Sequence, residues 1–290
     1  MTVARTIAGA VLALLLAACA REPRTLEQLF PKEPRPESLY YTADGYRVHY
    51  MQMAGPAGVR ILFIHGTPGD WTGWAHYLAD PELQKRATMI AVDRPGFGDS
   101  GAGHMVPAIR DQARLLEPLL RGPPSGSGPG ATTIVVGHSL GGPIAAELAM
   151  DYPAEVRSAV LIAPSIDPST EQPRWYNQAM TWWPVRRLAP DEFAWSNAEI
   201  MPLVPELESM APRWKSLPMP VTVIQGDKDR LVDPRTADYA ARMLPSGAAI
   251  VRVPDEGHFV LWEKPQIVVK AILAQLDAGL VAASHTGAGS

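Results

Sequence analysis

One serine in this sequence stands in a setting suited to covalent chemistry. Ser139 lies in the segment 137–142, Gly-His-Ser-Leu-Gly-Gly, between the apolar run 132–136 and a helix-like stretch that begins at Ile144. Small residues on both sides of a serine allow a sharp, strained turn from strand to helix, and this turn exposes the hydroxyl above a sheet. The pattern therefore predicts that Ser139 is a nucleophile.

A serine hydroxyl is a weak nucleophile, and a histidine is the usual base that removes its proton. His258 lies in the loop 255–259, Asp-Glu-Gly-His-Phe, after the apolar run 249–253. In that place the imidazole would lie above the strand ends and face Ser139, so we predict that His258 is the base. The other histidines are expected to support the functional turns in their neutral form (His65, His138) or to be structural or surface residues (His49, His76, His104, His285).

A carboxylate is needed to orient the histidine and to stabilise its protonated form. The segment 225–229, Gln-Gly-Asp-Lys-Asp, follows the apolar run 221–224 and offers Asp227 and Asp229. Asp167, which follows the apolar run 159–163, is a third candidate. The residues alone leave the choice among these three acids open.

Two backbone N–H groups are candidates for stabilising the negative charge that develops on an acyl oxygen. The turn at Ser139 places the Leu140 N–H at a helix N-terminus, where unpaired donors and the positive end of the helix dipole favour an anion. The loop 65–71, His-Gly-Thr-Pro-Gly-Asp-Trp, follows the apolar run 61–64, and its glycines allow the Thr67 N–H to face the same oxygen. Thr67 and Leu140 are therefore the predicted oxyanion-hole donors.

The elements that must position these residues alternate between short apolar runs and helix-like segments. Continuous apolarity marks strands that are covered on both faces, and predicts a mostly parallel sheet flanked by helices. We therefore expect an α/β fold whose core is formed by residues 39–164 and 219–282. Strands are predicted at 61–64, 88–92, 132–136, 159–163, 221–224 and 249–253, helices at 71–78, 109–120, 144–152, 236–244 and 266–276, and a hairpin at 39–41 and 46–51.

Residues 165–218 interrupt this alternation and are expected to form a helical cap insertion. Such an insertion after a strand would cover the C-terminal strand ends, where α/β folds bind ligands. Its tryptophans either form a small core of the cap itself or contact the substrate, and both roles are open. They are Trp175, Trp182, Trp183, Trp195 and Trp214, five of the eight in the chain. The glycine- and proline-rich segment 122–130 predicts a surface loop, and residues 283–290 predict a disordered tail.

Residues 1–18 have the composition of a signal peptide, because Arg5 precedes an apolar segment, 7–18, that is too short to span a bilayer. The run Leu-Ala-Ala-Cys at 16–19 resembles the lipobox of bacterial lipoproteins. That resemblance implies cleavage before Cys19, the only cysteine, and diacylation of its side chain. Ordinary cleavage after Ala20 is the alternative. The resemblance thus implies a lipid anchor at the periplasmic side of a bacterial membrane, and the four prolines of residues 19–38 predict an extended tether after it.

Together these motifs resemble the α/β-hydrolase superfamily over roughly residues 40–280, in the capped branch that includes epoxide hydrolases, haloalkane dehalogenases, proline iminopeptidases, carbon–carbon bond hydrolases and carboxylesterases. The similarity rests on His-Gly-Thr-Pro-Gly at 65–69, Asp-Arg-Pro-Gly-Phe-Gly-Asp-Ser at 93–100, the turn at Ser139, and Gly-His-Phe at 257–259. The chain order serine, acid, histidine is also that of the superfamily. The resemblance implies an acid three residues after Gly226, which selects Asp229, and it gives segment 93–100 no catalytic role.

The resemblance and Ser139 together imply hydrolysis through an acyl-enzyme, since epoxide hydrolases and haloalkane dehalogenases use an aspartate as nucleophile. We expect a serine hydrolase that cleaves an ester or related acyl bond of a small, largely apolar substrate. A carbon–carbon bond hydrolase is one alternative, and a binding lipoprotein on a hydrolase scaffold is the non-enzymatic one. A third is an aminopeptidase or amidase like the proline iminopeptidases, which needs acids to hold an amine; the candidates are Glu192, Glu199, Glu206 and Glu208.

The composition limits the partners of this chain. Its 290 residues carry a formal net charge of −4 without a long basic or acidic block, which argues against nucleic-acid binding. No metal or organic cofactor is implied. The expected partners are a small acyl substrate and, through the lipid anchor, a membrane; the sequence does not indicate an oligomeric state.

Overall fold

The structure, a computed structural model, describes residues 25–101, 104–121 and 131–286. The predictions for residues 1–18, for Cys19 and for the loop 122–130 concern parts of the chain outside these residues. The chain divides into two compact units, residues 1–35 and residues 36–290. In the first unit, α2 (Leu26–Leu29) is a single helical turn.

The stretch that was expected to be an extended tether is therefore partly folded. Its prolines favour extended backbone, but Thr25 and Gln28 form a capping box in which each side chain accepts the N–H of the other residue, at 3.3 and 2.9 Å. In the second unit, β1 begins at Glu37, one residue before the predicted end of the tether. The prediction for residues 19–38 is wrong at these two places.

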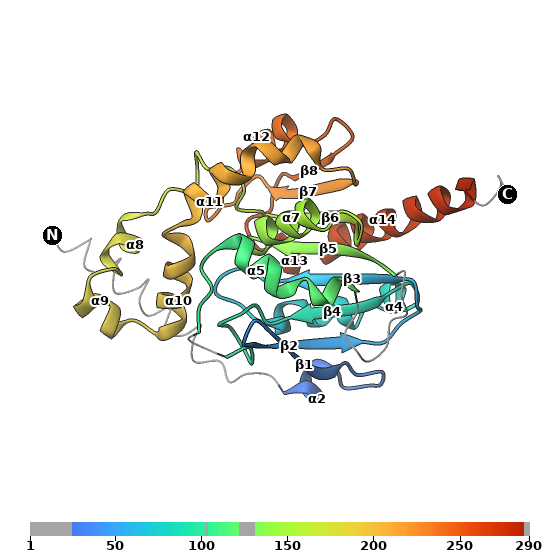
Figure 1. The fold of residues 1–290 in the computed structure, drawn as a ribbon, viewed down its shortest axis with the longest axis horizontal. Coiled ribbons are helices and arrows are strands. Elements are labelled where there is room, and N and C mark those ends of the chain that lie inside the picture. The colour runs from blue at the N-terminus through green and yellow to red at the C-terminus, as the bar shows by residue number, and fades with distance from the viewer. Residues whose placement is uncertain (1–24, 102–103, 122–130, 287–290) are drawn as a thin grey trace. The chain divides into compact units, whose positions relative to one another are not determined.

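Eight strands form one sheet in the order β1-β2-β4-β3-β5-β6-β7-β8 (Figure 1). The pairings of β1 with β2 and of β2 with β4 are antiparallel, and all other neighbours are parallel. The predicted hairpin and all six predicted strands are present. Their bounds are β1 (Glu37–Ala43), β2 (Tyr46–Met53), β3 (Val59–Ile64), β4 (Thr88–Val92), β5 (Thr132–His138), β6 (Val156–Ile162), β7 (Val221–Gly226) and β8 (Ala249–Val253).

The outermost strand, β8, departs from the prediction that each apolar run is covered on both faces. Of its five residues only Val253 is buried, whereas every residue of β4 and β7 is buried. β8 is the edge of the sheet and pairs only with β7. An apolar run therefore indicates a strand here without indicating how deeply that strand lies.

Helices pack against both faces of the sheet. Consecutive side chains of β3 point to opposite faces and show this arrangement. Leu62 belongs to a buried cluster shared with helices on one face. On the other face Phe63 stacks on Trp74 and Tyr77, at centroid distances of 5.0 and 5.6 Å. The helices of the first face are α5 (Ile109–Leu116), α6 (Pro118–Arg121), α7 (Gly141–Asp151) and α12 (Thr236–Met243). The remaining core helices are η1 (Trp71–Trp74), α3 (Ala75–Leu78), α4 (Pro81–Gln84), α13 (Val260–Glu263) and α14 (Pro265–Thr286).

The turn after β4 is held in place by Asp93. One oxygen of this buried carboxylate accepts the Trp71 N–H at 2.7 Å, and the other accepts hydrogen bonds from His49 Nδ1 at 2.7 Å and from the Asp99 N–H at 2.9 Å. A side-chain carbon at Gly98 would lie 2.3 Å from the same carboxylate. Although His49, Asp93 and Asp99 are residue types that bind metals, these hydrogen bonds already use the Asp93 oxygens. Asp93 is thus a structural residue, as expected for segment 93–100.

The segment between β6 and β7 is helical, as predicted for residues 165–218. It contains α8 (Trp175–Ala179), α9 (Trp183–Leu188), α10 (Asp191–Ile200), α11 (Leu203–Met210) and η2 (Ala211–Ser216), and we call it the insertion (Figure 1). Trp214 is fully buried in the cluster that also contains α7, whereas Trp175, Trp182 and Trp183 are exposed. Trp214 therefore packs in the cluster of the main core rather than in a separate core of the cap, and the three exposed tryptophans belong to no core.

α14 extends further than predicted. It runs to Thr286 and so includes the first residues of the segment, 283–290, that was expected to be a disordered tail. Adding a residue to an existing helix costs far less than starting one, and the Leu-Val-Ala-Ala run at 280–283 favours helix. None of the described helices is both long and apolar enough to cross a membrane.

Candidate active site

Ser139 occupies a strained turn between β5 and α7. Its φ is +53°, in the left-handed region that residues other than glycine seldom adopt. A side-chain carbon added to Gly137 would lie 2.2 Å from the carbonyl oxygen of Gly141, and one added to Gly141 would lie 2.3 Å from that of Ile64. The turn therefore fits only because both of these residues are glycine, as the segment 137–142 predicts.

His258 and Asp229 form a buried hydrogen-bonded pair, in which His258 Nδ1 lies 2.8 Å from Asp229 Oδ2. The other carboxylate oxygen accepts the N–H groups of Leu231 and Val232 at 2.8 and 3.0 Å. Burial acts to raise the pKa of Asp229, but the hydrogen bond and charge of His258 and the two N–H donors together hold this pKa below its ordinary value. An ionised Asp229 fixes Nδ1 as the donor, which leaves Nε2 of His258 as an acceptor.

The other two candidate acids have other partners. Asp227 accepts a hydrogen bond from Arg252 Nε at 2.8 Å, at the surface. Asp167 accepts the N–H and the hydroxyl of Ser169 at 2.9 and 2.7 Å. Among the described residues, Asp229 alone of the three candidates contacts His258. The geometry therefore favours Asp229 as its partner, in agreement with what the family resemblance implies.

His138 holds the loop of His258 beside the turn of Ser139. Its Nε2–H donates to the carbonyl oxygen of His258 at 3.0 Å, and the two rings lie 4.7 Å apart between centroids. Burial lowers the pKa of His138 to about 3, so this residue stays neutral, which fits the supporting role expected for it. Ser139 and His258 themselves share no hydrogen bond in the described part of the chain. Such bonds are often long until substrate is bound.

The loop after β3 lies directly against Ser139, because a side-chain carbon at Gly66 would be 2.8 Å from the Cβ of Ser139. The Gly66 carbonyl oxygen accepts hydrogen bonds from Arg94 Nη2 at 2.9 Å and from His65 Nδ1 at 2.7 Å. A trans peptide directs its N–H opposite to its carbonyl. The two donors therefore turn the N–H of the following residue, Thr67, away from Arg94 and His65.

The two predicted oxyanion-hole donors are unpaired. Neither the Thr67 N–H nor the Leu140 N–H has a hydrogen-bond partner among the described residues. Leu140 also caps α7, so its N–H lies at the positive end of that helix. Both groups are thus available to bind an anion, as an oxyanion hole requires.

Arg94, in the segment 93–100 to which no catalytic role was assigned, connects the insertion to this loop. Its guanidinium contacts Glu199 of α10 at 2.6 Å and Gln112 of α5 at 2.7 Å, and Arg94 and Glu199 are fully buried. Glu199 is therefore not free to hold a substrate amine, which corrects its place among the candidate acids. Glu206, another of those candidates, accepts a backbone N–H of α5 at 3.2 Å.

We expect Arg94→Met to lower kcat for a small ester by on the order of ten-fold, with little change in KM. The Gly66 carbonyl loses one of the two donors that orient the Thr67 N–H. The effect should be smaller than the loss of an oxyanion-hole donor itself, which costs about 10²–10³ in kcat. The variant also leaves Glu199 buried without its partner, at a cost of about 3–5 kcal/mol in stability.

The double variant Arg94→Met/Glu199→Met separates these two effects. It removes both charges, so the melting temperature should recover while kcat stays low. Recovery of kcat together with the melting temperature would show that Arg94 supports only the fold.

A half-buried acid that no sequence pattern indicated lies near the His258–Asp229 pair. One carboxyl oxygen of Glu171, Oε1, is inaccessible to solvent and has no hydrogen-bond partner in the described structure. Burial is the main cause that raises the pKa of Glu171, to about 8, and repulsion from Asp229 adds to it. Glu171 is therefore mostly protonated at neutral pH.

The raised pKa of Glu171 predicts a pH dependence of stability. Between about pH 4.5 and 8 the folded state holds a proton that the unfolded chain has lost, so the free energy of unfolding should fall as the pH rises through this range. Denaturant unfolding of Glu171→Gln should show a smaller fall. Glu208→Gln, at an exposed site of the insertion, is the control and should behave as wild type. Identical pH slopes for wild type and Glu171→Gln would contradict the assignment.

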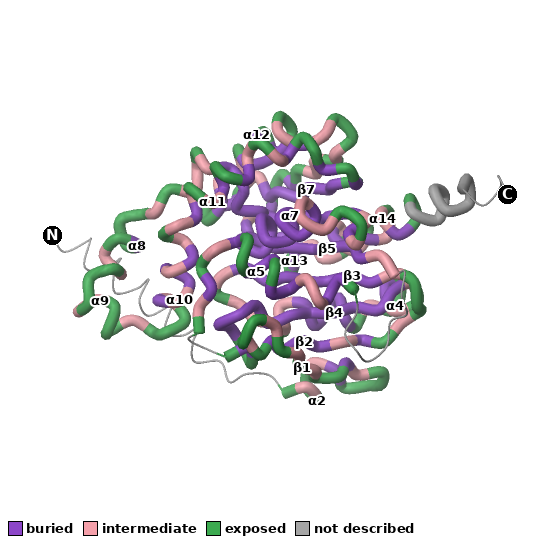
Figure 2. Tube along the Cα trace, viewed as in Figure 1, coloured by how far each residue is buried: buried purple, intermediate pink, exposed green. Residues whose placement is uncertain are grey.

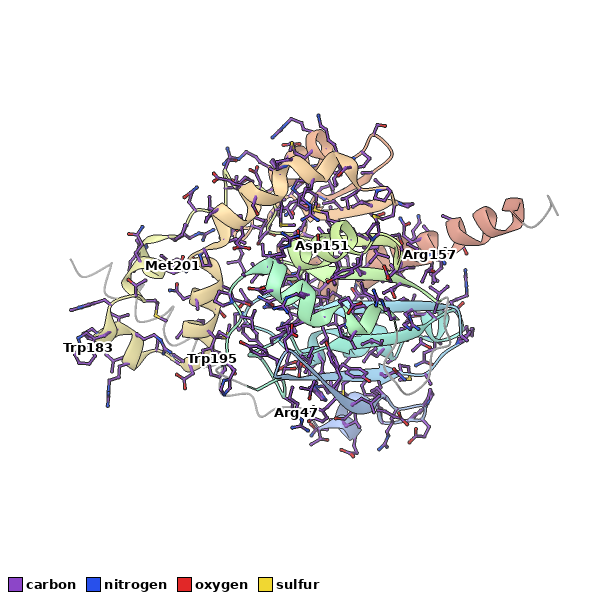
Figure 3. All side chains as sticks on the ribbon, in the orientation of Figure 1. Arg47, Asp151, Arg157, Trp183, Trp195 and Met201 are labelled. Atoms are coloured by element: carbon purple, nitrogen blue, oxygen red, sulfur yellow. The ribbon has the colours of Figure 1, made fainter. Side chains whose placement is uncertain are left out.

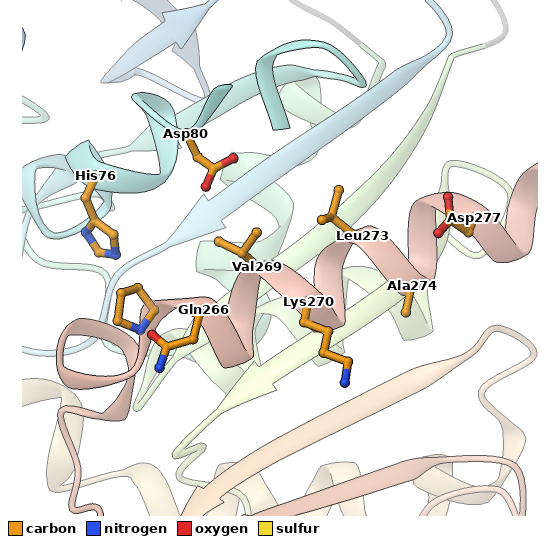
Figure 4. Close-up of a pocket in the computed structure, with 9 residues that line it drawn as sticks. His76, Asp80, Gln266, Val269, Lys270, Leu273, Ala274 and Asp277 are labelled. Atoms are coloured by element: carbon orange, nitrogen blue, oxygen red, sulfur yellow. The ribbon is translucent and has the colours of Figure 1, made fainter. Parts of the chain in front are cut away.

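A surface cavity of about 680 Å³ lies apart from these residues (Figure 4). Val269 and Leu273 of α14 line it together with His76 of α3 and with Asp80. None of the predicted catalytic residues borders it, so it plays no part in the site.

A comparison with known families decides the class of this chain. The model of the alpha/beta hydrolase family matches residues 61–271, well over half of the sequence. The chain belongs to the alpha/beta hydrolase family. The match covers Thr67, Ser139, Asp229 and His258, so the site described above lies within the family's own domain.

Two curated relatives of this family member match parts of it. The dihydrolipoyllysine-residue acetyltransferase component of the acetoin cleaving system of Cupriavidus necator is 38% identical over 121 residues, which are 42% of this chain and 30% of that protein. Mouse epoxide hydrolase 3 is 29% identical over 143 residues, 49% of this chain and 37% of that protein. The chain thus spans about a third of the length of the curated relatives it matches.

Solved structures share the fold of this family member at low sequence identity. A bacterial membrane phospholipase A is 20% identical with a TM-score of 0.63, and 96% of each chain is covered. A putative lipase from Acinetobacter baumannii is 19% identical with a TM-score of 0.65, over 90% of this chain and 99% of that one. A thermophilic esterase from Thermogutta terrifontis is 21% identical with a TM-score of 0.64, over 84% and 99%. At such identities these likenesses establish the fold.

Proposed function

We propose that this protein is a serine hydrolase that cleaves an ester bond of a small, largely apolar substrate through an acyl-enzyme. The observation that carries the proposal is the hydrogen-bonded pair His258–Asp229, placed by His138 beside a strained serine turn. A loop with an unpaired N–H lies against the same serine. The arrangement has the parts that acyl transfer needs: a nucleophile, an oriented base and donors for an oxyanion.

In the proposed reaction Nε2 of His258 takes the proton of the Ser139 hydroxyl as the oxygen attacks the ester carbon. Asp229 stabilises the imidazolium that forms, and the N–H groups of Thr67 and Leu140 bind the oxyanion. His258 then gives the proton to the departing alcohol, which leaves an acyl group on Ser139. Water repeats the same steps, so the acid is released and the serine is restored.

Apolar side chains next to the site support an apolar substrate. Leu231 follows the loop of Asp229, Phe259 follows His258, and Trp262 stacks on Phe259 at a centroid distance of 5.2 Å. All three are exposed, which is unusual for such large side chains beside a buried polar pair. They offer a surface for the acyl or alcohol part of an ester.

The acids near the site favour an ester over an aminoacyl substrate. Holding a substrate amine requires an ionised carboxylate within reach of the site. Glu199 is neutralised by Arg94, and burial keeps Glu171 protonated at neutral pH. Glu192 and Glu208 point to solvent as exposed residues of the insertion. An aminopeptidase is therefore the weaker of the two proposals.

A panel of p-nitrophenyl esters of increasing acyl length, run beside aminoacyl p-nitroanilides, tests the substrate class. We expect turnover of the esters and none of the anilides. Turnover of the anilides in preference to the esters would overturn the ester proposal and favour an aminopeptidase or amidase. If the protein turns over neither the esters nor the anilides, both the ester proposal and the aminopeptidase alternative are contradicted.

A further inference from the structure

Large apolar side chains cover the outer helices of the insertion. Trp175, Trp182 and Trp183 are exposed by 80%, 64% and 69%, and Leu188 by 88%. No residue of α9 is buried, as the green and pink tube of this helix in Figure 2 shows, and in Figure 3 Trp183 lies at the outer margin of the insertion. With Tyr176 these four residues form what we call the aromatic patch. Soluble proteins seldom expose so many large apolar side chains within one short segment unless that segment binds something.

The segment that carries the aromatic patch has only basic charged side chains, and acids flank it at Glu171, Asp191 and Glu192. Residues 172–190 contain Arg174, Arg186 and Arg187 and no Asp or Glu, although the whole chain carries a net charge of −4. Arg187 forms no ion pair with the described residues, and Arg186 forms an exposed ion pair with Asp191 at 3.6 Å. Tryptophan combined with arginine suits the headgroup region of a membrane, where the rings bury their apolar parts and the guanidinium groups attract anionic lipids.

We propose that the aromatic patch docks on an anionic lipid bilayer. The tryptophan rings enter the headgroup region, and Arg186 and Arg187 contact lipid phosphates. This contact is independent of the acylated cysteine expected near the N-terminus, and it does not depend on the proposed hydrolysis.

The aromatic patch is also joined to the loop of the predicted catalytic acid. Arg174, next to Trp175, donates hydrogen bonds to the carbonyl oxygens of Arg230 and Leu231, each at 3.1 Å. The Leu231 N–H in turn donates to Asp229. Docking through the aromatic patch therefore holds this loop, and the exposed Leu231 beside it, close to the lipid surface.

Quenching of tryptophan fluorescence by brominated lipids tests the proposal. The full chain carries Ser139→Ala, so that no lipid is hydrolysed, and the vesicles contain phosphatidylglycerol and brominated phosphatidylcholine. We expect strong quenching on binding. The variant Trp175→Phe/Trp182→Phe/Trp183→Phe should still bind these vesicles but lose most of the quenching. Binding with the same fractional quenching in this variant would place the contact elsewhere in the chain and overturn the proposal.

The arginines are tested by the affinity for the same vesicles. Arg186→Ser/Arg187→Ser should weaken binding about 30-fold at low salt, and it should have little effect on vesicles of phosphatidylcholine alone. The control at another exposed site is Tyr40→Ser/Arg47→Ser, which removes one arginine and the tyrosine whose ring lies 3.6 Å from it, on β1 and β2. This control should bind as before. An equal loss in both variants would show that the attraction is not specific to the aromatic patch.

Sedimentation distinguishes a lipid surface from a second copy of the chain. Three results together would overturn the proposal: the wild-type chain dimerises, the dimer is lost in Trp182→Ser/Trp183→Ser, and vesicles do not quench the tryptophan fluorescence. The aromatic patch would then be a dimer interface. None of these readouts measures hydrolysis, so a failure of the docking proposal leaves the turnover of soluble esters, and thus the proposed function, unaffected.

Discussion

Ser139→Ala and His258→Ala are each expected to abolish ester turnover, and the double variant is expected to be scarcely worse than either. The nucleophile and its base act as one unit, so removing one leaves the other without a function; in a well-studied serine protease each such loss costs about 10⁶ in kcat. Independent contributions would multiply instead. Rates of all three variants, measured on the best ester of the panel, give the comparison.

Folding controls keep this result interpretable. His104→Ala, at an exposed loop histidine, should retain wild-type turnover. Circular dichroism should show that Ser139→Ala is folded, since the change removes a single oxygen and leaves the glycines of the turn in place. A double variant whose loss relative to wild type equals the product of the two single losses would contradict a joint role of Ser139 and His258.

Asp229→Asn is expected to lower kcat by on the order of 10⁴, the loss seen for the equivalent change in a serine protease. An amide in place of the carboxylate cannot stabilise the His258 imidazolium, and its NH₂ group can donate to Nδ1 and so favour the wrong tautomer. Asp227→Asn is the matched control in the same loop, and it should cost little because Asp227 contacts Arg252 at the surface.

Asp167→Asn provides the opposite test, since Asp167 follows the neighbouring strand β6. Its carboxylate is bound by Ser169, so we expect a small effect on kcat. A larger loss in Asp167→Asn than in Asp229→Asn would show that the acid of the reaction lies after β6 rather than β7.

The elements that carry the site were predictable because local patterns determine them. The run before Ser139 and the run before Asp229 are continuously apolar, and both are buried parallel strands. Parallel strands place their C-terminal ends at one edge of the sheet, so residues that follow different strands meet there. His258 and Asp229, 29 positions apart, contact each other for this reason. The glycines at 137 and 141 were informative because a strained turn admits no side chain there.

Contacts between the insertion and the core were not predictable, since they depend on packing between distant segments. Arg94 and Glu199 are 105 positions apart, and no periodicity relates them. The one available signal was an arginine two residues after the end of the buried strand β4, at the edge where ligands bind. For Glu171 no pattern existed, because its raised pKa arises from burial beside Asp229. The exposure of Trp182 and Trp183 also escaped prediction, since tryptophan is usually read as a core residue.

Covalent labelling tests the central claim, that Ser139 is an activated nucleophile, most directly. The full chain is treated with a fluorophosphonate, which reacts with activated serine hydroxyls, and the labelled peptide is identified by mass spectrometry. We predict one adduct per chain, on Ser139, with labelling lost in Ser139→Ala and strongly slowed in His258→Ala. A folded wild-type protein that takes up no label, or takes it up on another serine at the same rate in Ser139→Ala, would contradict the account.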